Sequence, residues 1–207
     1  MAEFTFFTNP MSRGAIAHWA LLEVGADFEY AFVDWGDKPQ ALLDANPMGK
    51  VPTLVHHHGD HDHVVTEAAA ICHYLAETHP DAGLLPNAHK KADYFRWLFF
   101  AAGPIEAAVT SKAMGWEVPD DKRGMAGFGT YELAVDTLDN WLSSHDYVCG
   151  KTFTMADVYV GSQVDWGLMF KSLPDRDSFK AYAERLQQRE AYRKARAIEA
   201  EQRGDAA

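Results

Sequence analysis

A histidine-rich segment carries the densest set of chemically active groups in the sequence. Residues 56–63 read HHHGDHDH, which places five imidazoles and two carboxylates within eight positions, and such groups can bind a transition metal. Gly59 and Asp60 form a turn signal in its middle, so the segment is expected to be the tip of a β-hairpin. Exposed polar tips need no ligand to explain them. We therefore expect no functional metal site and only weak metal binding.

Cysteine, serine and glutamate side chains offer other chemistry. Cys72 and Cys149 are the only cysteines and lie in apolar surroundings, which predicts buried, unreactive thiols. Ser12 precedes a predicted helix, where serine is a favoured N-cap and its hydroxyl could also donate to an anion. Glu67 starts another predicted helix, where a carboxylate favours the positive end of the helix dipole. Ser12 and Glu67 thus each have a structural and a functional interpretation.

Charge and apolar patterning exclude several classes of protein. The 207 residues carry 30 acidic and 19 basic side chains, for a net charge of −11, and a field of this sign repels nucleic-acid phosphates. The most apolar stretches, such as residues 97–109, contain Gly, Pro and Glu and are too short to cross a bilayer. Residues 1–8 lack the basic start of a signal peptide. We expect a cytoplasmic protein without nucleic-acid or membrane partners.

The elements that must position these groups differ between the two halves of the chain. Over residues 1–79 the apolar period changes repeatedly, which predicts a β-α-β-α-β-β-α domain. Its strands are expected at 4–7, 28–33, 51–55 and 64–65, and its helices at 15–24, 39–45 and 67–78. The loop Asn-Pro-Met-Gly at 46–49 leads into the third strand.

Two prolines and a glycine interrupt the helical patterns within residues 80–88, which predicts a linker. Residues 89–207 are predicted to form an all-helical domain, with helices at 90–110, 122–144, 154–171, 178–189 and 191–201. Gly103-Pro104 is expected to kink the first helix. Thr154-Met-Ala-Asp157 has the spacing of a capping box at a helix start.

Four segments, in this order and at these separations, resemble the cytosolic glutathione transferases. They are FFTNPMSRGAIAHWALLEVG at 6–25, NPMGKVPTL at 46–54, TEAAAICHYLAE at 66–77 and GKTFTMADVYVGSQV at 150–164. The resemblance covers nearly the whole chain and includes bacterial members. It implies a thioredoxin-like glutathione-binding domain at 1–79, a linker at 80–88, a helical domain at 89–207 that contributes the electrophile site, and a homodimer.

The resemblance also implies how glutathione, with two carboxylates, an ammonium group and a thiol, is held. Glu67 matches the acidic residue that accepts the ammonium group of the γ-glutamyl part. Val51 matches the residue whose backbone pairs with the cysteinyl part, and Pro52 after it matches a cis proline. Lys50 is expected to meet the glycyl carboxylate, whereas Lys38 is interpreted as a solvated surface charge.

Two positions depart from the family pattern. Ala68 stands where a serine usually holds the γ-glutamyl carboxylate, so we expect weaker binding through backbone amides of the helix start. The first strand has no tyrosine and the turn after it has no cysteine, so a serine-type site with Ser12 as the catalytic residue is expected. Asn9 and Arg13 stay open as alternatives because the register of this turn is ambiguous.

The predicted function is that of a glutathione transferase which adds the glutathione thiolate to hydrophobic electrophiles, with glutathione as cosubstrate and a role in detoxification. Two alternatives share the fold. One is a non-catalytic protein that binds hydrophobic ligands or a partner protein, and the other is a glutathione-dependent isomerase.

Overall fold

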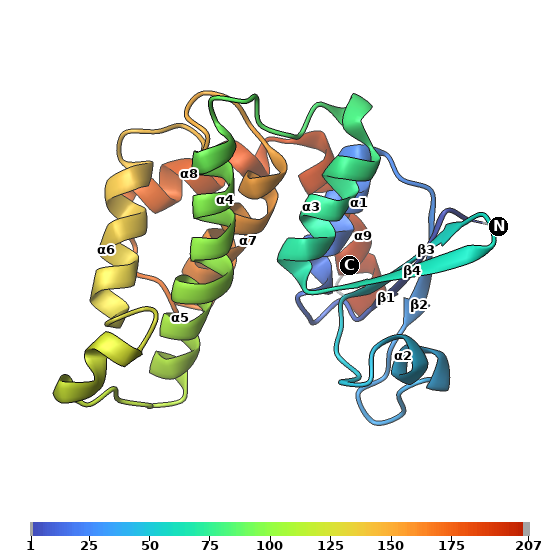
Figure 1. The fold of residues 1–207 in the computed structure, drawn as a ribbon, viewed down its shortest axis with the longest axis horizontal. Helices are drawn as coiled ribbons and strands as arrows, with labels where there is room; N and C mark the ends of the chain where they lie inside the picture. The colour runs from blue at the N-terminus through green and yellow to red at the C-terminus, as the bar shows by residue number, and fades with distance from the viewer. Residues whose placement is uncertain (1, 205–207) are drawn as a thin grey trace. The chain divides into compact units, whose positions relative to one another are not determined.

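The structure, a computed structural model, describes residues 2–204 and divides into two compact units. The first unit runs to Leu84 and resumes at Gln188, and the second spans Leu85–Gln187 (Figure 1). The α/β and all-helical classes predicted for the two halves are confirmed. The domain predicted at 89–207 includes the C-terminal segment, whereas in the structure the described residues from Gln188 onward pack with the first unit. Residues 205–207 of that predicted domain lie outside the described residues.

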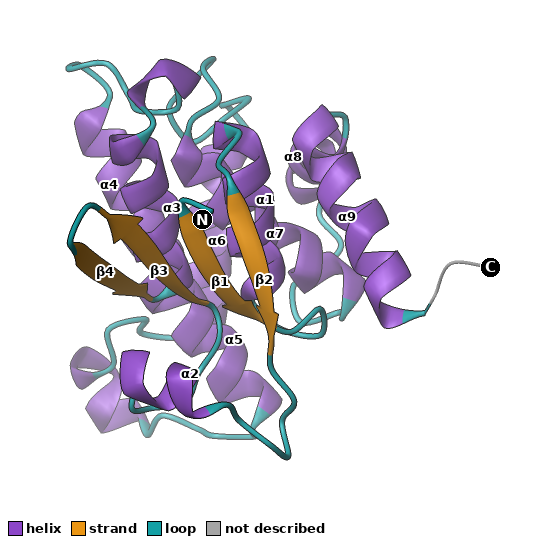
Figure 2. Ribbon diagram, turned by 90° about the vertical axis from the view of Figure 1, so that its right-hand side faces the viewer, coloured by secondary structure: helices purple, strands orange, loops and turns teal. Residues whose placement is uncertain are grey.

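A four-stranded sheet forms the centre of the first unit (Figure 2). Its order is β2-β1-β3-β4, with β2 parallel to β1 and the other neighbours antiparallel. The strands β3 and β4 are longer than predicted, because polar histidines continue the hairpin pairing as far as the turn and hide the alternating pattern. The bounds are β1 (Phe4–Thr8), β2 (Phe28–Phe32), β3 (Thr53–His58) and β4 (His61–Thr66).

Successive side chains of β1 point to opposite faces of the sheet, and a helix packs on each face. Phe6 faces the helix α1 (Gly14–Val24), with its ring 6.3 Å from that of His18. Phe7 faces the short helix α2 (Gln40–Ala45) and forms a core cluster with Leu42 and Val55. The helix α3 (Ala68–Thr78) packs beside α1. This arrangement leaves the ends of the strands, rather than their faces, accessible to a ligand.

The terminal helix α9 (Glu190–Arg203) packs on α1. His18 Nδ1 lies 2.9 Å from Glu199 Oε1, and both side chains are almost fully buried. Arg189 binds both carboxylate oxygens of Glu23, at 2.6 and 2.7 Å. These contacts join residues 181 and 166 positions apart, which leaves no local signal in a sequence for the packing of α9 on α1.

The second unit is helical throughout its regular structure. Pro104 lies inside a π-helical segment, Ala101–Ile105, between two helices, and this interruption accommodates a residue without an amide hydrogen. The helix predicted from 122 instead begins at Tyr131, since three glycines precede it and Thr130 caps it. The helices are α4 (Lys91–Phe100), α5 (Glu106–Ala113), α6 (Tyr131–Leu142), α7 (Met155–Met169) and α8 (Asp177–Gln187).

The capping box predicted at the start of α7 is confirmed. Asp157 is fully buried, and its carboxylate accepts hydrogen bonds from Val148 N at 2.8 Å, Thr154 N at 2.9 Å and the Tyr182 hydroxyl at 2.8 Å. Burial nevertheless raises the pKa of Asp157 to about 6. Between Ala2 and Gly204, no helix has the length and apolarity needed to cross a membrane.

Candidate functional site

The loop that leads into β3 is held by one buried asparagine. Asn46 Nδ2 donates to Lys50 O at 3.2 Å and to Thr53 Oγ1 at 3.1 Å, while its Oδ1 accepts from Met48 N at 3.2 Å. These bonds hold the backbone before Val51 and the Thr53 side chain after it. The bond between Val51 and Pro52 is cis, as the family resemblance implied.

A lysine side chain lies against this loop. Gly49 is buried with φ 58°, and a Cβ built on it would lie 3.1 Å from Lys38 Cδ and 3.2 Å from Lys38 Nζ. Lys38 is half-buried and forms no ion pair with any described residue, unlike the solvated surface charge expected from the sequence. Lys50 is exposed and likewise forms no ion pair within residues 2–204. Two uncompensated cations therefore lie at or beside Val51.

Glu67 occupies an unusual position at the start of α3. It is the N-cap residue rather than part of the first turn, and its φ of 66° lies in the left-handed region. A non-glycine residue held there costs about 1–3 kcal/mol, and such residues cluster at functional sites. Its side chain caps nothing, is exposed and has no partner among the described residues. The carboxylate is thus free to bind a ligand.

The amide groups at the start of α3 complete a site for both charges of an amino acid. Ala68 is 7% exposed, and its methyl group offers no hydrogen bond. The first four N–H groups of any α-helix lack intrahelical partners. They attract anions together with the helix dipole. A carboxylate there and an ammonium group at Glu67 would match the α-amino acid end of a peptide.

The turn between β1 and α1 is organised by Asn9. Its Nδ2 donates to Val33 O and its Oδ1 accepts from Met11 N, both at 2.9 Å. Its carbonyl oxygen accepts the Ser12 hydroxyl at 2.6 Å, and Ser12 Oγ accepts Gly14 N at 2.9 Å. The Ser12 proton is therefore already donated within the protein.

Strand pairing brings these segments together at one end of the sheet. Thr53 pairs with Phe7 on one side and with Thr66 on the other. Pro52, one residue earlier, therefore lies between the segment that follows Phe7 and the segment that follows Thr66. The first contains Ser12, and the second begins with Glu67. The predicted site residues Ser12, Pro52 and Glu67 therefore lie at the same end of the sheet. Arg13, the N-cap residue of α1, lies there too.

The cysteines are buried, and the histidine-rich hairpin lines a pocket together with Glu3 and Tyr74. Burial raises the pKa of Cys72, and it raises that of Cys149 to about 11, so neither thiol is ionised at neutral pH. His56 bonds the Tyr74 hydroxyl at 2.8 Å, and its ring lies 5.4 Å from that of His58. Burial lowers the pKa of His56. Across residues 2–204, no three His, Cys, Asp or Glu side chains are arranged to hold a metal ion.

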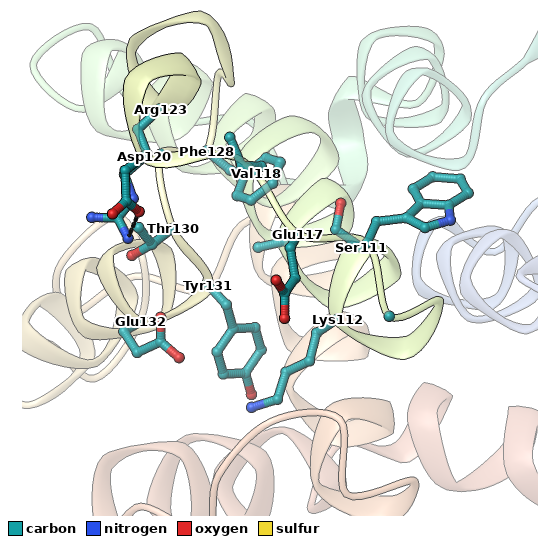
Figure 3. A pocket seen from close by; sticks show the side chains of 14 residues that line it. Ser111, Lys112, Glu117, Val118, Asp120, Arg123, Phe128, Thr130, Tyr131 and Glu132 are labelled. Atoms are coloured by element: carbon teal, nitrogen blue, oxygen red, sulfur yellow. Dashed lines mark ion pairs between the residues drawn. The ribbon is translucent and has the colours of Figure 1, made fainter.

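A pocket of about 460 Å³ lies in the second unit, between α5, α6 and the segment that joins them (Figure 3). The Lys112 ammonium lies 3.6 Å from the centre of the Tyr131 ring, where a cation–π interaction holds it. The other walls combine aromatic and apolar groups with hydroxyl and charged groups, which suits an amphipathic molecule. These lining residues include Trp116, Glu117, Val118, Phe128 and Glu132.

Two family models match the chain. Residues 2–77 match the N-terminal domain of glutathione S-transferase, and residues 104–190 match its C-terminal domain. The glutathione S-transferase GstA of Escherichia coli O157:H7 is 27% identical over 88% of this chain and 92% of its own length. Glutathione S-transferase U1 of Arabidopsis thaliana is 30% identical, with coverages of 79% and 69%.

A relative with a different name shares a higher percentage of identical residues over a shorter part of the chain. A probable maleylacetoacetate isomerase of Caenorhabditis elegans is 41% identical over 68% of this chain and 67% of its own length. Among solved structures, a sphingomonad glutathione S-transferase complexed with glutathione superposes with a TM-score of 0.74. It is 26% identical, and the alignment covers 95% of this chain and 98% of the other.

Proposed function

The chain belongs to the glutathione S-transferase family, and from this premise we propose that it transfers glutathione to hydrophobic electrophiles. Glutathione is the cosubstrate. Binding must neutralise two carboxylates and one ammonium group, and activation must ionise a thiol with an ordinary pKa near 8.5. The chemistry then lies in the cosubstrate, since positioning and thiol ionisation suffice for the attack.

The observation that carries this proposal is the free carboxylate of Glu67 at a strained N-cap beside the amides of α3. We assign the γ-glutamyl ammonium to Glu67 and the neighbouring carboxylate to the amides from Ala68 onward. Val51 and Pro52 present the backbone for the cysteinyl part. Lys50 is assigned to the glycyl carboxylate, and the half-buried position of Lys38 against the same loop makes it a second candidate.

The thiol is assigned to the start of α1, where the helix dipole favours an anion. Ser12 is the hydroxyl that the sequence places there. Because it donates to Asn9 O in the structure, it must rotate away from that carbonyl before it can donate to sulfur. Asn9 also has its side-chain amide bonded, to Val33 O.

Two further parts of the proposal concern the second substrate and assembly. The helical unit offers this pocket to the electrophile, so Trp116→Ala should raise the KM for an apolar electrophile more than that for glutathione. The protein is proposed to be a cytoplasmic homodimer. Light scattering at micromolar concentration tests the dimer, and a monomeric mass would exclude it.

Conjugation of glutathione to an activated chloronitrobenzene tests the activity directly. The proposal predicts a rate above the uncatalysed reaction that saturates with both substrates. If glutathione binds with no rate enhancement, the non-catalytic alternative holds. The 41% identical relative named as an isomerase favours a second activity, and glutathione-dependent isomerisation of maleylacetoacetate by the purified protein tests it.

A further inference from the structure

A second hydroxyl lies at the start of α1, and its surroundings differ from those of Ser12. Thr8, the last residue of β1, is 4% exposed. Its hydroxyl forms no hydrogen bond with any residue that the structure describes. Thr8 Oγ1 is not one of the buried side-chain atoms that lack a partner within residues 2–204, so the small exposed part of Thr8 includes its hydroxyl. The hydroxyl is therefore open to solvent and free to donate to a bound ligand.

Packing against a glycine fixes where this hydroxyl points. Thr8 lies on the same face of β1 as Phe6, which is the face covered by α1. A Cβ built on Gly14, the first residue of α1, would overlap Thr8 Oγ1 and would lie 2.9 Å from Ser12 Oγ. The two hydroxyls thus flank Gly14 at the positive end of an eleven-residue helix.

Strand pairing places the same residue beside the proposed cysteinyl site. Phe7 pairs with Thr53 in the antiparallel ladder between β1 and β3. The next step of that register sets Thr8 opposite Pro52, directly after Val51. A cysteinyl group paired with the backbone of Val51 would therefore carry its sulfur toward the end of β1 and the start of α1.

We propose that the Thr8 hydroxyl donates the hydrogen bond that stabilises the glutathione thiolate. This inference rests on the proposed function and deepens it by naming the donor. The thiol loses its proton to solvent, and Thr8 stays protonated while its O–H points at the sulfur. The thiolate then forms the new bond to the electrophilic carbon, and the leaving group departs with its electron pair. Ser12 orders the turn through Asn9 and Gly14.

The replacement Thr8→Val removes the hydroxyl and keeps the shape of the side chain. Titration of thiolate absorbance in the glutathione complex should show the pKa of the bound thiol rising by about one unit, a tenfold loss of thiolate at neutral pH. The kcat/KM at pH 6.5 should fall about tenfold and converge with that of the wild type above pH 9. Thr8→Ser should retain most of the activity because it keeps the donor.

Two controls separate this role from a structural one. Thr5→Val makes the same change on the opposite face of β1, away from α1, and should leave the thiol pKa unchanged. The melting temperature of the free Thr8→Val protein should not fall, because its hydroxyl has no partner to lose. A lower melting temperature with an unchanged thiol pKa would overturn the proposal and make Thr8 a packing residue.

The outcomes distinguish this inference from the function on which it rests. If the wild type neither lowers the thiol pKa nor conjugates glutathione, the proposed function fails and the inference fails with it. If the wild type does both and Thr8→Val does the same, only the inference fails. A loss of thiolate in Ser12→Ala but not in Thr8→Val would return the role to Ser12.

Discussion

The starts of α3 and α7 use an acidic side chain in opposite ways. At α7, Asp157 is buried and accepts hydrogen bonds from two backbone amides and from a tyrosine hydroxyl. At α3, Glu67 is exposed, caps nothing and has no partner among the described residues. Its backbone is also held in the left-handed region. A carboxylate whose hydrogen bonds are used within the protein serves stability, whereas one left unpaired at a strained position is available to a ligand.

Replacing the buried carboxylate should give the largest effect on stability. Asp157→Ala leaves Val148 N, Thr154 N and the Tyr182 hydroxyl without an acceptor in the interior. Unfolding in urea should show a loss of about 3–4 kcal/mol, because several buried donors lose their partner at once. A loss below about 1 kcal/mol would mean that this capping box contributes little.

The charge on Asp157 should make stability depend on pH. Its pKa rises from 3.8 to about 6 on folding, so the folded chain binds the proton more tightly. The corresponding stability is complete below about pH 4 and is lost as the pH rises through about 6. The unfolding free energy of the wild type minus that of Asp157→Asn should fall by about 2 kcal/mol between pH 4 and pH 7, since the unfolded carboxyl group is already largely ionised at pH 4. A constant difference would show that the carboxyl pKa is not raised.

Removing the exposed carboxylate should instead act on binding. Glu67→Ala should weaken glutathione affinity by about 1.5–3 kcal/mol, since it deletes a charged hydrogen-bond acceptor, while the unfolding free energy changes by less than about 1 kcal/mol. Calorimetric titration with glutathione measures the affinity. Glu77→Ala, an exposed glutamate near the other end of α3, is the matched control and should bind normally. Equal affinity of the wild type and Glu67→Ala would remove Glu67 from the site.

The backbone strain at Glu67 gives the smallest and most specific effect. Glycine adopts a φ of 66° without penalty, so Glu67→Gly should be about 1 kcal/mol more stable than Glu67→Ala and should bind glutathione equally poorly. Lys171 has a φ of 56° at the end of α7, and Lys171→Gly should also gain stability without any change in affinity. A Glu67→Gly protein less stable than Glu67→Ala would contradict the strain assigned here.

The same contrast explains what could be predicted from the sequence. Thr154 and Asp157 form a local motif, so their spacing alone predicted the capping box, and local periodicity predicted most helices and strands. The backbone angle of Glu67 has no sequence signal, since glutamate does not favour a positive φ. The position of α9 depends on contacts such as that between His18 and Glu199, and the unpaired hydroxyl of Thr8 depends on packing against Gly14. These features require three-dimensional structure.

A crystal structure with glutathione tests the central claim, which is that Glu67 is left unpaired so that it can bind this ligand. The γ-glutamyl ammonium should lie about 3 Å from the Glu67 carboxylate, and the adjacent ligand carboxylate should accept from the first amides of α3. The backbone φ of Glu67 should stay positive. Glutathione bound with its ammonium group away from Glu67 would contradict the account.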